Sequence, residues 1–167
     1  MSYLEHLFAL TGKTALVTGG ASGIGRMLSE ALVRAGARVF IASRKGETCA
    51  ATATELNALA APGSAEGFAG DLATEAGVDA LATEVSARTD KLHILVNNAG
   101  RTWGAPLGSF PYAAWDGVIG LNVTGPFMLT QKLLPRLEAA ATAADPARVV
   151  NLGSVMGTQA ISKGAYS

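Results

Sequence analysis

The chain has 167 residues, of which 49% are hydrophobic and 16% are charged. This length suits one domain with a sizeable buried core. Thirteen lysines and arginines balance thirteen aspartates and glutamates, and no basic stripe or apolar span of ~18 residues occurs, so nucleic acid and membranes are not expected partners.

The few cysteines and histidines argue for a reducing compartment and against a metal. Cys49 is the single cysteine and has no disulfide partner in the chain. His6 and His93 have no further ligands around them at metal-binding spacing, so we expect no metal site. The first residues lack the basic and small-residue pattern of a secretory signal, and we expect a cytoplasmic protein.

Short apolar runs alternate with longer amphipathic ones along the chain. The short runs predict buried strands at 14–19, 38–43, 65–71, 92–99 and 147–154. The segments between them predict helices at 24–37, 46–61, 75–89 and 112–140, the last interrupted near Gly125 and Pro126. This alternation predicts an α/β fold, a doubly wound parallel sheet of the Rossmann type, with a ligand crevice where the first and fourth strands end.

The first of these helices has an apolar stripe and a predicted end. Its spacing favours a buried face formed by Ile24, Leu28, Ala31, Leu32 and Ala35, with Gly36 as the residue that ends the helix.

A glycine-rich turn, TGGASGIG, joins the first strand to this helix at residues 18–25. A residue without Cβ at Gly19 or Gly20 lets the strand turn at once. Gly23 keeps the unpaired N–H groups of the helix start open to a pyrophosphate, and Gly25 lets the helix pack closely. The alternative is a turn without a ligand, and the spacing departs from G-x-G-x-x-G.

These residues resemble the T-G-x-x-x-G-x-G cofactor turn of the short-chain dehydrogenase/reductase family. Residues 97–100 (NNAG) match a second family motif, Asn122 falls where the family has a helical asparagine, and residues 151–154 (NLGS) fit its catalytic-serine strand. The resemblance runs over nearly the whole chain. It implies that residues 1–167 are one dinucleotide-binding domain whose C-terminal part is missing after the fifth strand, leaving that strand as an exposed edge.

The second strand indicates which nicotinamide cofactor to expect. It ends in Ser43, Arg44 and Lys45, with no carboxylate until Glu47. A guanidinium pairs with a 2′-phosphate, which a carboxylate would repel, so we expect NADP(H); an exposed basic turn is the alternative. The resemblance implies these cofactor-binding residues: Gly19, Ser22, Gly23, Ile24, Gly25, Ser43, Arg44, Asp71, Leu72, Asn98, Ala99 and Gly100.

Two of the neighbouring polar residues have a second interpretation. The resemblance gives Asp71 to the adenine amino group, whereas on its own it is a cap for the following helix. Asn97, which precedes the implied cofactor residues, has a structural role as its alternative.

The resemblance implies that Ser154 holds the substrate carbonyl and that Asn122 orders a water chain. The alternatives are a serine that bonds its own turn and a kink residue. The family's Y-x-x-x-K motif is incomplete: either Tyr166 is the acid, or that tyrosine lies beyond Ser167, and Lys163 precedes the tyrosine and does not match.

The implied function is NADP(H)-dependent reduction of a carbonyl, in the manner of 3-oxoacyl reductases, by a protein that forms homo-oligomers at full length. We expect this segment alone to be inactive. The alternative is a non-catalytic dinucleotide sensor or interaction module on the same fold.

Overall fold

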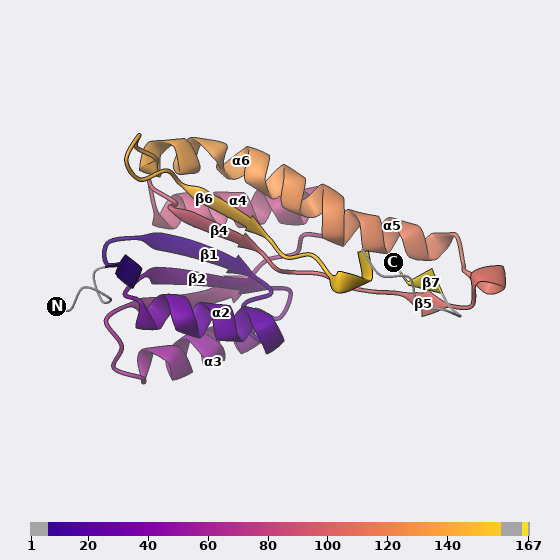
Figure 1. Ribbon diagram of the computed structural model, residues 1–167, viewed down its shortest axis with the longest axis horizontal. Helices are drawn as coiled ribbons and strands as arrows, with labels where there is room; N and C mark the ends of the chain where they lie inside the picture. Colours follow the sequence, from indigo (N-terminus) through magenta and orange to yellow (C-terminus); the bar gives the residue numbers. More distant parts are fainter. Residues whose placement is uncertain (1–6, 158–164, 167) are drawn as a thin grey trace.

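The computed structural model describes residues 7–157 and 165–166 and is built around a five-stranded parallel sheet (Figure 1). The strands lie in the order β3-β2-β1-β4-β6, and each neighbouring pair is parallel. Their bounds are β1 Thr14–Thr18, β2 Arg38–Ser43, β3 Ser64–Ala69, β4 Ile94–Asn97 and β6 Arg148–Asn151. The predicted fold class is therefore confirmed.

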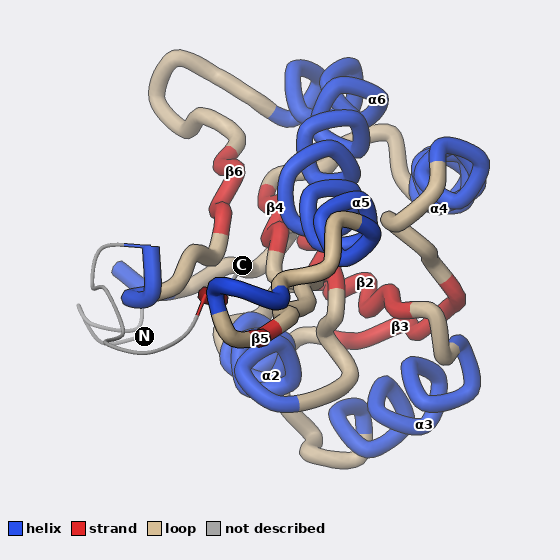
Figure 2. The backbone as a smooth tube through the Cα atoms, turned by 90° about the vertical axis from the view of Figure 1, so that its right-hand side faces the viewer, coloured by secondary structure: helices blue, strands red, loops and turns tan. Residues whose placement is uncertain are grey.

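Helices cover both faces of the sheet (Figures 1 and 2). One face carries α2 (Gly23–Arg34) and α3 (Gly46–Asn57). The other carries α4 (Glu75–Arg88) and α6 (Gly125–Ala140). A π-helical segment, Gly120–Thr124, joins α6 to α5 (Ala113–Ile119).

The sheet separates two apolar cores. Along β1, Leu16 belongs to the core under α4 and α6, whereas Ala15 and Val17 belong to the core under α2 and α3. Side chains of a strand alternate between its two faces, and every residue of β1 is buried. A central strand that is apolar throughout is the pattern that parallel sheets require, because both faces are covered.

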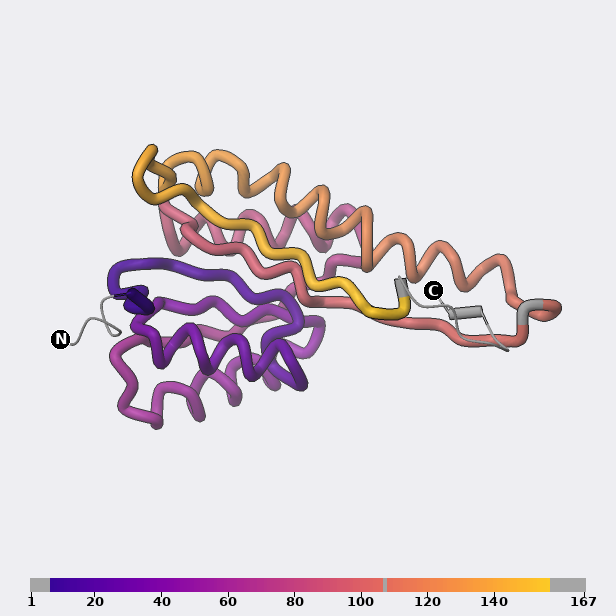
Figure 3. Tube along the Cα trace, viewed as in Figure 1, coloured from indigo at the N-terminus to yellow at the C-terminus, as the bar shows by residue number. Residues whose placement is uncertain are grey.

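The chain reverses its direction of travel across the sheet between β1 and β4 (Figure 3). It passes outward from β1 to β2 and β3, and then returns to place β4 on the other side of β1. Past the C-terminal ends of these strands lie α5 and the short pair β5 (Gly104–Ala105) and β7 (Ala165–Tyr166), with a 3-10 turn at Leu107–Ser109. The reversal therefore lies between β1 and β4, where the ligand crevice was predicted.

The buried face of α2 is not the one that the apolar spacing predicts. The helix buries Gly25, Ser29 and Val33, whereas Ile24 is 64% exposed. Leu28 and Leu32 are only partly buried against the core. The reason is close approach: small residues bring the helix start against the glycine turn, and this contact sets the rotation of the helix.

The two helix ends differ in how well they were predicted. Gly36 lies two residues after the end of α2, directly after its C-cap Ala35, with φ +100°, and its N–H donates to the carbonyl of Val33, as expected for a helix-ending glycine. In contrast, α3 ends at Asn57, several residues before the predicted end. The Asn57 side chain bonds both the N–H and the C=O of Ala65 in β3, at 2.8 and 2.9 Å.

β6 is the outer strand of the sheet, and all four of its residues are exposed. It is shorter than the predicted strand at 147–154, because pairing with β4 ends at Asn151. A 3-10 turn at Val155–Gly157 follows soon after. The expected exposed edge is therefore present.

Candidate cofactor and active site

Two adjoining pockets open where the parallel strands end. The smaller has a volume of about 440 Å³ and lies beyond β1, β2 and β3. The larger has a volume of about 1360 Å³ and lies between α6 and the segment that follows β6. The two pockets share part of their lining, which includes Ile24, Asn98, Ala99 and Gly100.

The smaller pocket brings together nearly all residues that the resemblance assigns to the cofactor. Its lining includes Gly19, Ser22, Ile24, Gly25, Ser43, Arg44, Asp71, Leu72, Asn98, Ala99 and Gly100. Gly23 is not part of the lining, although it begins α2 directly after Ser22. The side chain of Ile24, expected in the core, is instead exposed beside the pocket.

The glycine turn is shaped by two close approaches and two positive φ angles. A Cβ on Gly25 would lie 2.2 Å from the carbonyl oxygen of Gly19, and one on Gly19 would lie 2.9 Å from Nδ2 of Asn98. Gly19 and Gly23 both have positive φ, at +66° and +52°. These positions exclude larger residues, so the turn stays free of side chains on the pocket side.

The start of α2 offers unpaired backbone donors to this pocket. Ser22 is the N-cap and makes no side-chain capping bond. The first helical bond runs from the Arg26 N–H to the Ser22 carbonyl, so the N–H groups of residues 23–25 have no acceptor within the helix. An anion placed here would be stabilised by these donors and by the helix dipole.

Thr18, which we did not predict as a site residue, connects the ends of β1 and β4. Its hydroxyl donates to the Val96 carbonyl at 3.2 Å and accepts from the N–H groups of Asn98 and Ala99, both at 3.1 Å. The Asn98 side chain completes the contact by donating to the carbonyls of Thr18 and Gly19. The sequence signal that could have identified Thr18 is its position as the first residue of the glycine-rich turn.

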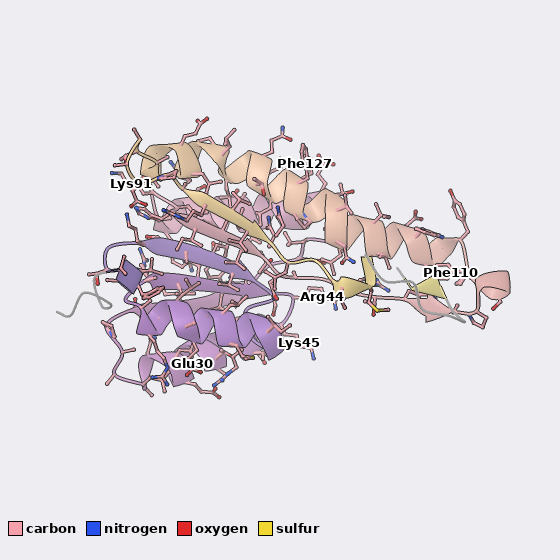
Figure 4. All side chains as sticks on the ribbon, viewed as in Figure 1. Glu30, Arg44, Lys45, Lys91, Phe110 and Phe127 are labelled. Atoms are coloured by element: carbon pink, nitrogen blue, oxygen red, sulfur yellow. The ribbon has the colours of Figure 1, made fainter. Side chains whose placement is uncertain are left out.

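Arg44 follows β2 and lines the smaller pocket. It is exposed and makes no ion pair with another described residue. Figure 4 shows Arg44 and Lys45 at the end of the sheet where the parallel strands finish. Ser43 beside them lies 3.0 Å from the buried thiol of Cys49.

Asp71 is not the helix cap that it would be on its own. Its carboxylate accepts from the Ala73 N–H at 2.9 Å, and Thr74 caps α4 by accepting from the Gly77 N–H at 3.1 Å. Two residues separate Asp71 from the cap, because the loop after β3 makes one more turn before α4 begins. Leu72, beside it, is buried in the core.

Asn97 joins two strands and a helix. It is 5% exposed, and its Nδ2 donates to Oδ1 of Asn151 at 2.8 Å and to the Thr130 hydroxyl at 3.3 Å. These bonds connect β4 to β6 and α6, so they agree with the alternative of a structural role for Asn97. The partners are side chains and not backbone groups.

Asn122 lies in the π-helical segment that replaces the distortion predicted at Gly125 and Pro126. Gly125 follows that segment, and a Cβ on it would lie 2.3 Å from the Leu72 carbonyl. The Asn122 amide accepts from the Arg101 N–H at 2.9 Å and donates to the Arg101 carbonyl at 2.8 Å. The asparagine therefore anchors the loop after β4.

Ser154 lies three residues beyond β6 and, like Asn122, lines the larger pocket. Its Oγ accepts from the Met156 N–H at 3.2 Å, which is the turn contact of the alternative interpretation. This contact uses the oxygen as acceptor and leaves the hydroxyl proton to donate. Lys163 lies outside the described residues, and Tyr166 is described only through its place in β7.

Two absences apply to residues 7–157 and 165–166. No group of three or more histidine, cysteine, aspartate or glutamate residues there is arranged to hold a metal ion. None of the helices in this part combines the length and apolar character needed to cross a bilayer.

The order β3-β2-β1-β4-β6, with a glycine turn after β1 and a pocket at the β1–β4 switch point, defines the class of doubly wound α/β proteins that bind dinucleotides. The family model of the short chain dehydrogenases matches residues 13–167. The chain therefore belongs to the short-chain dehydrogenase family.

Proteins of known identity resemble the chain over nearly all of its length. The rhamnolipids biosynthesis 3-oxoacyl-[acyl-carrier-protein] reductase of Pseudomonas aeruginosa is 49% identical over 164 residues, which are 98% of this chain and 63% of the relative. D-threitol dehydrogenase of Mycolicibacterium smegmatis is 36% identical over 93% of this chain and 58% of the relative. The chain thus spans about three fifths of these relatives.

Solved structures give the same result. The P. aeruginosa RhlG/NADP active-site complex superimposes with a TM-score of 0.88 at 49% identity, covering 93% of this chain and 59% of that one. A metagenomic short-chain oxidoreductase in complex with NADP has a TM-score of 0.80 at 35% identity, covering 91% and 66%.

Proposed function

We propose that the protein is an NADP(H)-dependent oxidoreductase that reduces a carbonyl to a secondary alcohol, and that this chain supplies its cofactor-binding part. The observation that carries the proposal is the smaller pocket. It runs from the glycine turn and the open start of α2 to Arg44, a cation with no acidic partner among the described residues.

The residues present fit a dinucleotide phosphate. Gly19 and Gly25 leave no room for a Cβ, so the turn keeps its backbone accessible to a phosphate group. Arg44 would pair with a 2′-phosphate, and no aspartate or glutamate lies among the pocket residues near it except Asp71, after the next strand. The two NADP complexes among the similar structures support the same cofactor.

The cofactor, when bound, supplies a hydride. The chain's own residues then have two tasks in the larger pocket. The Ser154 hydroxyl donates a hydrogen bond to the substrate oxygen, on which negative charge develops during reduction. Asn122, through its two bonds to Arg101, holds the loop after β4 in position beside that oxygen, and it is our candidate for ordering water.

The proton donor has two candidates, Tyr166 and a tyrosine after Ser167, and a following lysine would lower the pKa of that group. We propose that this segment by itself is inactive, because the lysine of the Y-x-x-x-K motif is not among residues 1–167. We also propose that the full-length protein is a cytoplasmic homo-oligomer.

The proposed substrate is a 3-oxoacyl compound. The support is the 49% identity to the P. aeruginosa 3-oxoacyl reductase, since the larger pocket offers both the donor Ser154 and an apolar wall that includes Phe127 and Leu134. The alternative, a dinucleotide sensor without catalysis, predicts cofactor binding with no turnover of any carbonyl.

The test is a charge reversal at Arg44 in the full-length natural protein. Arg44→Asp removes the phosphate partner and introduces a carboxylate, so we expect NADPH affinity to fall by about 10- to 100-fold, from the strength of one charge-assisted bond. NADH affinity should change by no more than about twofold. Fluorescence titration measures both constants.

The matched control is Lys45→Asp, which places the same charge at the adjacent residue, outside the lining of the smaller pocket. Equal losses for NADPH and NADH in Arg44→Asp would contradict the assignment. Turnover of acetoacetyl thioesters with NADPH separates the enzyme from the sensor.

A further inference from the structure

Arg101 is the charged residue of the larger pocket. Among the described residues that line this pocket, every other side chain is neutral. Arg101 is absent from the lining of the smaller pocket, so it does not belong with the groups assigned to the cofactor. It shares the larger pocket with Ser154, proposed to bind the substrate oxygen, and with Asn122, proposed to order water.

The backbone of Arg101 is held on both sides. Its N–H donates to Oδ1 of Asn122 at 2.9 Å, and its carbonyl accepts from Nδ2 of the same side chain at 2.8 Å. Asn122 is itself part of the π-helical segment between α5 and α6. The backbone of Arg101 is therefore held in place, although the residue lies in a loop.

The side chain is directed by a glycine. A Cβ on Gly117 would lie 2.7 Å from Nη1 and 3.2 Å from Cζ of Arg101, so the guanidinium occupies the space that a side chain on α5 would fill. Asp116, the preceding residue, forms no ion pair with it. The guanidinium is thus positioned by packing and not by an opposite charge.

Most cations in the described part of the chain are neutralised. Lysines and arginines of the helices and strands pair with carboxylates, as Arg38 does with Glu66 at 2.6 Å and Lys132 with Asp79 at 2.5 Å. Within residues 7–157 the cations without an ion pair are Arg44, Lys45, Lys91 and Arg101. Lys91 lies at the opposite end of the sheet from Arg44 (Figure 4).

We propose that Arg101 binds an anionic group of the substrate, a carboxylate or a phosphate ester, and selects charged carbonyl compounds over neutral ones. This inference rests on the proposed carbonyl reduction and adds a specificity-determining residue to it. A guanidinium held in place loses little freedom on binding and can donate two parallel hydrogen bonds to such a group.

The experiment compares three carbonyl substrates in the full-length natural protein with NADPH: acetoacetate, acetoacetyl-coenzyme A and neutral ethyl acetoacetate. Arg101→Gln should lower kcat/KM by about tenfold or more for an anionic substrate, because it removes a charge-assisted bond. Ethyl acetoacetate should stay within about twofold. Loss with acetoacetate identifies a carboxylate site, and loss with acetoacetyl-coenzyme A alone identifies a phosphate site.

Two further variants control for structure and charge. Arg101→Lys keeps the charge and should recover part of the loss. Lys91→Gln removes an unpaired cation far from both pockets and should leave all three kcat/KM values unchanged. No loss in Arg101→Gln, or equal losses for the three substrates, would overturn the proposal.

A second measurement separates this proposal from the proposed function. If the unaltered protein reduces none of the three compounds, carbonyl reduction of this kind fails. Calorimetric titration of acetoacetate and of coenzyme A into the protein saturated with NADP⁺ then decides the role of Arg101. Weaker binding to Arg101→Gln supports the anion site, and equal or absent binding rejects it.

Discussion

Thr18 is the residue on which the geometry of the crevice depends most directly. Its side chain is buried, at 1% exposure, and its single hydroxyl serves one acceptor and two donors from the end of β4. The bonds hold Asn98 and Ala99 at the rim of both pockets. The Thr18 hydroxyl therefore joins the end of β1 to the end of β4, where the two pockets meet.

We predict that Thr18→Val destabilises the protein by about 1–3 kcal/mol, because the isosteric side chain removes the acceptor of the partly buried Ala99 N–H and one of the two acceptors of the Asn98 N–H. The melting temperature should fall by roughly 2–12 °C for a protein of this size. Thr18→Ser retains the hydroxyl and is the matched control. Urea unfolding that gives the same stability for valine and serine would contradict the assignment.

Ser154 is the residue whose loss should affect chemistry without affecting the cofactor. It lines the larger pocket and not the smaller one. In the full-length natural protein, Ser154→Ala should lower kcat by about 100-fold, as loss of one donor to a developing oxyanion does. The Kd for NADPH should be unchanged. Steady-state kinetics and titration test the two parts, and wild-type turnover would remove Ser154 from the mechanism.

At the scale of elements, β1 and β4 are joined at their N-terminal ends by His93. The Thr14 N–H donates to Nδ1 of His93 at 3.0 Å, an interaction that requires this nitrogen to carry no proton. Burial lowers the pKa of His93 from 6.5, and the positive charge of Lys13 lowers it further, while Asp145 acts in the opposite direction. Lys91 adds a smaller lowering effect.

The pKa shift predicts a loss of stability in acid. The folded state binds a proton at His93 less readily than the unfolded state, so the contribution is complete above pH 6.5 and declines as the pH falls through the lowered pKa. We expect the melting temperature to drop between pH 7.5 and pH 5.5, and His93→Gln to reduce that drop. His6→Gln, which removes the other histidine, is the control; an unchanged drop in His93→Gln would contradict the prediction.

Ion pairs and cation–ring contacts join other elements. The Asp145 carboxylate contacts Lys13 and Arg148, and these bonds lower its pKa to about 2. Arg38 and Arg88 bracket Glu66 of β3 and each stacks on a phenylalanine ring. The Lys13–Asp145 and Arg38–Glu66 pairs were not predictable, since they join residues far apart in the chain that only folding brings together.

At the scale of the whole molecule, the lining of the smaller pocket includes the segments that follow four strands, β1, β2, β3 and β4. Arg44 comes from the end of β2, Asp71 follows β3, and Asn98 follows β4. A ligand that contacts all of them is bound by the native state only. Binding should therefore stabilise the entire fold and not a single loop.

We predict that NADPH at about 100 times its Kd adds about 2.7 kcal/mol to the stability of the full-length natural protein. This corresponds to a rise in melting temperature of roughly 5–11 °C. NADH at the same concentration should give a smaller rise, because it offers no phosphate to Arg44. Differential scanning fluorimetry measures both, and identical shifts would contradict the cofactor preference.

The pattern of residues along the chain was sufficient for the fold class, and of the twelve cofactor residues that the family resemblance implied, all but Gly23 line the smaller pocket. Apolar runs and the glycine turn depend on neighbours in sequence, so β1 and β2 were placed within one residue. The exposed edge β6 also followed from the order of elements. The buried face of α2 was predicted wrongly, because its rotation is set by the contact of Gly25 with Gly19 and Asn98, which lies across the switch point.

The tertiary structure alone decided how the site is held together. Thr18, Asn97 and Asn122 each bond to a partner from another element, and nothing in the local sequence names that partner. The same is true of Arg101, whose guanidinium fits the space above Gly117. Local sequence determines which backbone shapes are accessible, whereas hydrogen bonds and close approaches between distant segments form only after the chain has folded, and these define the two pockets.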